Sequence, residues 1–219
     1  MKIDLHLHTS YGSSCAYMDP DQLIERAKFI GLDGVCITDH NQVWDADVIA
    51  RLRKKHDYLV IGGVEVSTDC GDILAFGVHQ SVLKVGRATD LRAMVDEAGG
   101  VMVIAHPFRA YPALVNAHAH STTVGPTRAI KEACSRSELG IVDALEACNG
   151  QSSRDEVGFC YAVADSLSLG GTGGSDAHAT LGVGACYTEF EDHVEDERDL
   201  IRQIKEGQFK AVDDRWADL

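Results

Sequence analysis

The chain has 219 residues, a length that suits one domain with a sizeable apolar core. Its 20 basic and 34 acidic residues give a formal net charge of −14, which disfavours a long nucleic acid as partner and favours a small substrate. The seven cysteines are scattered and form no CxxC pair, so the sequence indicates neither a disulfide framework nor a structural zinc knuckle, and a reducing cytoplasm is the expected location.

Short apolar runs typical of strands alternate along the chain with amphipathic runs typical of helices. The first pair is a strand at residues 2–7 and a helix at 19–31, which Asp19 caps, Pro20 begins and Gly31 ends. Later strands are expected at residues 33–38, 58–67, 72–78, 100–106, 142–148 and 170–176. Later helices are expected at residues 45–56, 89–99, 127–140, 154–169 and 195–207. About seven strands, each paired with a helix, indicate one α/β domain over residues 1–219.

The least regular stretch runs from Arg109 to Pro126 and is expected to be a long loop over one face of the domain. It carries His118 and His120, but no strand aims these two rings, so we interpret them as exposed. Met1 is followed at once by Lys, Asp and two His, and no later apolar run approaches membrane-spanning length. We therefore expect neither a signal segment nor a membrane partner.

A pair of histidines lies at the end of the first expected strand. His6 and His8 are two residues apart, so both rings point to the same face, and Asp4 shares that face further back. A lone histidine in a strand is usually a core residue, but an HxH pair at a strand end favours a metal site, because two imidazoles can then reach one ion.

Ionisable side chains recur at the ends of the other strands. They are His40, Glu65, His106, Glu146, Asp176 and His178. In an α/β barrel such positions converge on the mouth formed by the carboxyl ends of the strands. Several histidines mixed with several carboxylates suit Zn, Mn or Fe, and a bridging carboxylate allows two ions to lie close together. The sequence therefore predicts two or three divalent metal ions as cofactors.

Six motifs, DLHLHT, GLDGVCITDHN, GVEVS, AHP, DALEACNG and GGSDAH, occur in this order and resemble the polymerase and histidinol phosphatase (PHP) family across nearly the whole chain. The resemblance implies a distorted TIM-like (β/α)7 barrel with up to three metals at its mouth. It also implies that His6, His8, Glu65 and Asp176 hold one ion, and that Glu65 bridges to a second ion, which His106 also binds. Glu146 stands where many relatives have another ligand.

A third ion would use His40 and His178 with a partner from the loop at residues 13–19, where this chain departs from the family pattern. Relatives often place Asp or His there, whereas this loop offers Ser13, Ser14, Cys15 and Asp19, and Asp19 is better explained as a helix cap. The third site is therefore expected to be the weakest. Asp72 stands where some relatives have His, and it is either a ligand or a solvated turn residue.

Metals held in this way can activate water and clamp phosphoryl oxygens, so we expect hydrolysis of a small phosphomonoester or short nucleotide. His178, His40 or a metal-bound water assists the leaving oxygen. Arg109 either grips the substrate phosphate or forms a surface salt bridge. The alternatives are a C–N or C–O hydrolase of amidohydrolase-like chemistry, since activated water attacks carbonyls equally well, and a metal-binding regulatory module without turnover.

Overall fold

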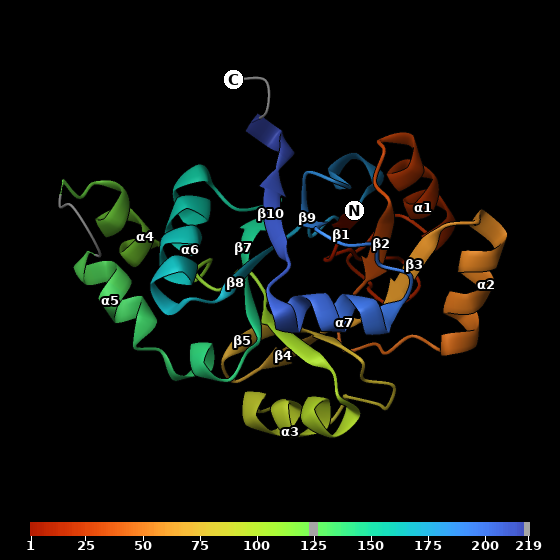
Figure 1. Cartoon of the computed structure of the whole chain (residues 1–219), viewed down its shortest axis with the longest axis horizontal. Helices are drawn as coiled ribbons and strands as arrows, with labels where there is room; N and C mark the ends of the chain where they lie inside the picture. Colours follow the sequence, from red (N-terminus) through yellow and green to blue (C-terminus); the bar gives the residue numbers. More distant parts are fainter. Residues whose placement is uncertain (123–126, 217–219) are drawn as a thin grey trace.

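The structure is a computed structural model that describes residues 1–122 and 127–216, and within them strands and helices alternate as expected (Figure 1). The strands of the first half are β1 (Lys2–Asp4), β2 (Gly34–Ile37), β3 (Leu59–Gly62), β4 (Val64–Thr68), β5 (Gly71–Phe76) and β6 (Val101–Ile104). Those of the second half are β7 (Ala144–Asn149), β8 (Gly170–Gly174), β9 (Cys186–Phe190) and β10 (Phe209–Asp213). The helices are α1 (Pro20–Phe29), α2 (Ala46–His56), α3 (Ala88–Ala98), α4 (Pro112–Ala119), α5 (Arg128–Cys134), α6 (Arg154–Leu167) and α7 (Glu197–Glu206).

These strands form two mixed sheets of five. The first has the order β10-β9-β1-β2-β3, in which β1, β2 and β3 are parallel and β9 is antiparallel to both of its neighbours. The second has the order β4-β5-β6-β7-β8, in which β4, β5 and β6 are antiparallel and β6, β7 and β8 are parallel. The molecule is therefore an α/β fold, as the sequence predicts.

The distorted TIM-like barrel that the family resemblance implies is not confirmed, because no closed barrel is detected among the described strands. No continuous ladder joins the two sheets there. Isolated bridges join Leu7 to Ala177 and His40 to Glu65, and hydrogen bonds between the Thr188 hydroxyl and the backbone of Gly173 also cross between the sheets. Strand β4 turns directly into β5, which runs antiparallel, with no crossover helix between them.

The helices cover the outer faces of the sheets. In Figure 1, α4, α5 and α6 lie at one end of the molecule, α1 and α2 at the other, with α3 below and α7 across the middle. Helix α1 begins as predicted: Asp19 caps it by accepting from the Gln22 amide at 2.8 Å, and Pro20 stands in its first turn. Gly31 lies just past its end at φ +80°.

Apolar side chains from both sheets and α7 meet in a cluster between the sheets. Its fully buried members include Leu5, Leu74, Val103, Phe76 and Leu200. Leu5 immediately precedes His6, and Val103 lies three residues before His106. This cluster fixes the strands whose ends carry the polar residues described below.

Two expectations about local structure are wrong. The stretch 109–126, expected to be a loop, contains helix α4, which Pro112 begins and which is rich in alanine; residues 123–126 of the stretch lie outside the described residues. The number of strands was underestimated, because β9 and β10 pair antiparallel with each other next to β1. None of the helices in the described ranges combines the length and apolarity needed to cross a bilayer.

Candidate metal centre

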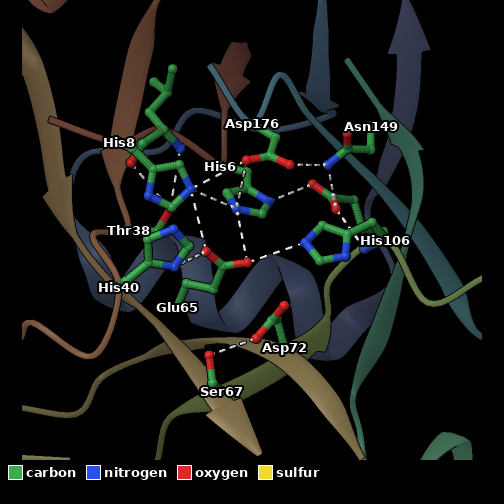
Figure 2. Close-up of polar contacts among 12 residues, drawn as sticks. His6, His8, Thr38, His40, Glu65, Ser67, Asp72, His106, Asn149 and Asp176 are labelled. Atoms are coloured by element: carbon green, nitrogen blue, oxygen red, sulfur yellow. Dashed lines mark hydrogen bonds and ion pairs between the residues drawn. The ribbon is translucent and has the colours of Figure 1, made fainter. Parts of the chain in front are cut away.

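Side chains from both sheets converge where the strands end (Figure 2). His6 and His8 follow β1, His40 follows β2, and Glu65 lies in β4. His106 follows β6, and Asp176 and His178 follow β8. These are the strand-end residues that the sequence analysis selected, and the fold brings them within reach of one another.

The first donor group consists of His6, His8 and Asp176. The two Nε2 atoms of His6 and His8 are 3.1 Å apart, and they lie 3.6 and 3.3 Å from Oδ1 of Asp176. All three side chains are buried. Two ring nitrogens that face each other beside a carboxylate oxygen offer three donor atoms to one cation.

The second donor group consists of His6, Glu65 and His106. Glu65 Oε1 lies 3.3 Å from His6 Nε2 and 3.2 Å from His106 Nε2. Its other oxygen, Oε2, lies 3.3 Å from His8 Nε2 and 2.8 Å from His40 Nδ1. One buried carboxylate thus contacts four imidazoles, which is the placement of a bridging ligand.

The Oε2 atom of Glu65 provides a test of whether a cation fits. Although His40 Nδ1 is 2.8 Å away, Oε2 is buried without a well-aligned hydrogen bond among the described residues. Hydrogen bonds weaken steeply with angle, so the short distance to His40 Nδ1 does not satisfy this oxygen. A buried carboxylate oxygen with open lone pairs beside several imidazoles fits a divalent ion.

The third donor group consists of three imidazoles, those of His8, His40 and His178. His8 completes it, where a residue from the loop after β1 was expected. From that loop, the Ser13 hydroxyl lies 3.3 Å from His8 Nδ1 and accepts from the His40 amide at 3.1 Å. Asp19 is engaged as the cap of α1.

Glu146 lies behind the first two groups. Its Oε1 is 2.9 Å from His6 Nδ1, and its Oε2 accepts from the His106 amide and from Asn149 Nδ2 at 2.8 and 3.0 Å. It belongs to none of the convergent donor groups found in the described chain. A carboxylate in this position fixes the orientation of the His6 ring, whose Nε2 then faces the other donors.

Arg109 reaches the same cluster from the residues after β6. Its guanidinium donates to Oδ2 of Asp176 at 2.8 Å and to Oδ1 of Asn149 at 2.9 Å, while 40% of its side chain remains exposed. The sequence left two roles open for Arg109, phosphate binding and a surface salt bridge. In the structure its positive charge lies beside the candidate ligands. It also borders a cavity of about 440 Å³ lined by His106, Asp72 and neighbouring residues.

Three other residues considered from the sequence lie apart from the donor groups. Asp72 Oδ1 accepts from the Ser67 hydroxyl at 2.8 Å, and Figure 2 shows this pair below the cluster. His118 lies in α4 with its ring 5.4 Å from that of Phe159, and His120 caps the end of α4. Both were expected in a loop, and the helix directs them away from the centre.

The charges of the cluster shift its pKa values. Burial lowers the pKa of His6, but the negative charges of Glu146 and Glu65 outweigh burial and raise this pKa well above its usual value. Burial raises the pKa of Glu65, yet the His6 charge and the hydrogen bond from His106 hold it well below its usual value. At His8 burial dominates, so the pKa of the ring is lowered. A cation entering here competes with a proton on His6.

The backbone at two of these residues is strained. His106 has φ +30° and Asp176 has φ +54°, a region that side chains other than glycine rarely adopt. Close packing leaves little space beneath them: a Cβ at Gly174 would lie 2.4 Å from His6 Cβ and 2.8 Å from Glu146 Oε1. The glycine at residue 174 therefore allows close packing beneath the candidate ligands.

Asp39 is a site residue that the sequence analysis missed. It is fully buried and accepts from the Thr9 amide at 2.7 Å, the Ser13 hydroxyl at 2.6 Å and Trp44 Nε1 at 3.0 Å. It thereby fixes the loop that carries Ser13 against His8. Its position next to His40 was the only available signal, since its partners come from distant parts of the chain.

Comparison with known proteins identifies related chains. The model of the PHP domain matches residues 4–125, and a model described as PHP-associated matches residues 159–209. An uncharacterised protein of Methanocaldococcus jannaschii is 27% identical over 117 residues, which cover 49% of this chain and 68% of that protein.

Two solved structures cover most of the chain. PsfC from Pseudomonas syringae PB-5123 has a TM-score of 0.63 at 22% identity and covers 97% of this chain and 91% of its own. A proposed metal-dependent phosphoesterase from Bifidobacterium adolescentis has a TM-score of 0.60 at 15% identity and covers 92% and 95%.

A third solved structure is an amidohydrolase from Chromobacterium violaceum with bound sulfate and no metal. It has a TM-score of 0.60 at 16% identity and covers 82% of this chain and 88% of its own. At identities this low, the similarity to all three structures shows the fold.

Proposed function

Because the chain belongs to the PHP domain family, we propose that it is a metal-dependent phosphoesterase acting on a small phosphomonoester or short nucleotide. The observation that carries this proposal is the convergence of three donor groups, of which the first shares His6 with the second and His8 with the third. The donor set of imidazoles and carboxylates favours Zn, Mn or Fe, two or three ions per chain. Residues 1–219 are proposed to work as one hydrolase domain.

We assign His6, His8, Asp176, Glu65 and His106 to the first two ions. When bound, divalent ions would supply activated water and neutralise charge on phosphoryl oxygens. His40 and His178, with His8, would hold a third ion. Glu146 is proposed to position the His6 ring rather than to ligate, because it contacts Nδ1 of His6 and belongs to none of the convergent donor groups in the described chain.

Arg109 is proposed to bind the phosphate. Its guanidinium is anchored on Asp176 and Asn149 but partly exposed at the edge of a cavity, so its remaining donors can face a ligand there. The side chains of His40 and His178 are 38% and 26% exposed, more than those of the ligand candidates that form the first donor group. We propose that, where the third ion is absent, one of them hands a proton to the leaving oxygen.

A second candidate function is hydrolysis of a C–N or C–O bond. The similarity to the amidohydrolase from Chromobacterium violaceum favours it, because that fold hosts the chemistry named for that protein. Water activated in the same centre could attack a carbonyl. Arg109 argues for phosphate instead, because a guanidinium matches phosphoryl oxygens with two parallel hydrogen bonds.

The test is a matrix of substrates and metals. Chelator-treated protein is supplied separately with Mn²⁺, Zn²⁺, Fe²⁺ and Mg²⁺ and assayed on phosphomonoesters, dinucleotides, simple carboxyl esters and amides. We expect phosphate release with at least one of the first three ions, lost in His6→Ala at matched metal concentration. Amide or ester turnover alone would select the second candidate, and no turnover with any ion would contradict both.

A further inference from the structure

A second group of metal-ligating side chains lies away from the candidate metal centre. It consists of Cys148 in β7, Cys186 at the start of β9 and Asp213 at the end of β10. One Sγ or carboxylate oxygen of each lies within 4.8 Å of those of the others. Both thiols are fully buried, and the Asp213 side chain is 13% exposed. Three segments distant in sequence are needed to assemble it.

Arg215 balances the charge of this group. It donates to the two oxygens of Asp213 at 2.8 and 2.6 Å, and to the carbonyls of Gly150 and Ser152 at 2.9 and 2.6 Å. A divalent ion that displaces the thiol protons of Cys148 and Cys186 releases two protons to solvent. The buried charge stays at zero, because the ion and the guanidinium then balance two thiolates and one carboxylate.

The distances suit a tetrahedral ion. Ligands at zinc–sulfur and zinc–oxygen distances of about 2.3 and 2.0 Å lie roughly 3.5–4 Å apart, which is compatible with the 4.8 Å limit that all three donor atoms meet. Each oxygen of Asp213 has two lone pairs, so a bond from Arg215 leaves one for an ion. The Val212 carbonyl oxygen accepts from Cys148 Sγ at 3.7 Å, and it or a water would complete the site as a fourth ligand.

We propose that Cys148, Cys186 and Asp213 form a second metal site, separate from the catalytic cluster and selective for a thiophilic divalent ion such as Zn²⁺. Thiolates favour such ions over Mg²⁺ or Mn²⁺, which prefer oxygen ligands. The ion links β9 and β10 of the first sheet to β7 of the second sheet. Cys148 lies two residues after Glu146, at the bulge between β7 and β8. The site therefore also supports β7, whose Glu146 contacts the His6 ring.

The test uses cobalt as a spectroscopic probe in the full-length protein. Thiolate ligands give Co²⁺ a sulfur-to-metal charge-transfer absorption in the near ultraviolet, which imidazoles and carboxylates of the catalytic cluster cannot produce. The variants are Cys186→Ala and Cys148→Ala. Cys36→Ala is the matched control, because Cys36 is equally buried but belongs to no donor group in the described chain.

We expect the charge-transfer band and a single thiolate-bound equivalent of cobalt in the wild type and in Cys36→Ala. Both should be absent from the Cys186→Ala and Cys148→Ala proteins, while cobalt in the catalytic cluster is retained. A wild type without the band, or a band that persists without Cys186, would overturn the proposal. So would purified wild type in which Cys148 and Cys186 form a disulfide.

A second measurement, on the wild type alone, tests the site even if the variants fail to fold. Zn²⁺ should slow alkylation of Cys148 and Cys186 by a thiol reagent under mildly denaturing conditions, and should leave the alkylation rate of Cys36 unchanged. Equal protection of Cys36, or no protection of Cys148 and Cys186, contradicts the site.

Discussion

Asp4 is a fully buried carboxylate directly beneath the metal centre. It accepts from the amides of Ser175 at 2.9 Å, Gly184 at 3.0 Å and His6 at 3.3 Å. Burial nevertheless dominates and raises its pKa from 3.8 to about 6. The folded state therefore binds a proton here more tightly than the unfolded state, and this favourable contribution is lost as pH rises from about 4 through 6.

The first prediction concerns the Asp4→Asn variant, which cannot ionise. As pH rises from 4.5 to 7.5, the free energy of unfolding of metal-free wild type should fall relative to the variant by about 2 kcal/mol. Any pH-independent cost of the amide cancels in this comparison. Urea unfolding of both proteins across this range measures it, and a difference that stays constant with pH would refute the assignment.

The second prediction concerns Arg109, which rests on Asp176 and Asn149. Arg109→Ala should raise the KM for a phosphomonoester about tenfold, roughly 1.4 kcal/mol of lost uniform binding, with a smaller fall in kcat. Arg202→Ala is the control, because Arg202 is 43% exposed and forms ion pairs with Asp199 and Glu206 on α7. Steady-state kinetics at matched metal content decides, and unchanged parameters would return Arg109 to a structural role.

The strand-end residues of the centre could be predicted because side chains alternate along strands. His6 and His8 share a face by their spacing alone, and Glu65, His106 and Asp176 follow apolar runs. The rotation of each ring could not be predicted. Whether Glu146 ligates or supports His6, and whether His8 completes the third donor group, depends on side-chain torsions that the whole packed site determines.

Helix α1 is an element whose limits the sequence determined correctly, because its signals are local. Asp19, Pro20 and Gln22 form a capping box within four residues. Strands β9 and β10 were missed because their partner is distant: β9 pairs with β1, at the other end of the chain. Helix α4 was missed because PALVNAHA lacks an amphipathic pattern.

The third prediction follows from the capping box. Asp19→Ala should lower stability by about 1 kcal/mol, or roughly 2–4 °C in Tm, without changing metal content. Asp47→Ala is the control, since Asp47 lies in the first turn of α2 beside the cap residue Asp45. Thermal unfolding and metal analysis of both variants test this. Metal loss specific to Asp19→Ala would show that Asp19 is a ligand.

The fourth prediction concerns strand β8 and the space beneath His6. Gly174→Ala should weaken metal retention and cost about 1–3 kcal/mol, because the added Cβ overlaps His6 and the Glu146 carboxylate. Gly158→Ala in α6 is the matched control, with nothing within 4 Å of its added Cβ, and it should gain about 0.5–1 kcal/mol. Metal analysis and Tm measure both, and equal behaviour of the two variants would contradict the packing argument.

At the scale of the whole molecule, the α/β class could be predicted, but the division into two sheets could not. The alternation of strands and helices is visible in the sequence. The pairing of β4 with β5 depends on the short turn at residues 69–70, and the separation of the sheets depends on which ladders continue. The distorted TIM-like (β/α)7 barrel implied by the resemblance pairs each strand with a helix, whereas no helix separates β3, β4 and β5 in this chain.

The two isolated bridges between the sheets have a consequence for how the molecule opens. Few backbone hydrogen bonds cross the boundary between the two sheets, here called the seam. Among them, the His8 amide donates to the Ala177 carbonyl at 3.1 Å and the Asn41 amide donates to the Glu65 carbonyl at 2.7 Å. His6 and Glu65, from opposite sides of it, also face the same candidate ion. An ion bound there would clamp the two halves together.

Amide hydrogen exchange should therefore report metal binding at the seam. Mn²⁺ is expected to slow exchange at the amides of His8 and Asn41 in chelated protein, and to leave Val103, inside the β5–β6 ladder, unchanged. Equal slowing at all three would mean that the ion acts on global unfolding. If the seam alone responds, the ion proposed for catalysis also controls where the protein opens locally. Removing the metal would then open the molecule along the boundary between its two sheets.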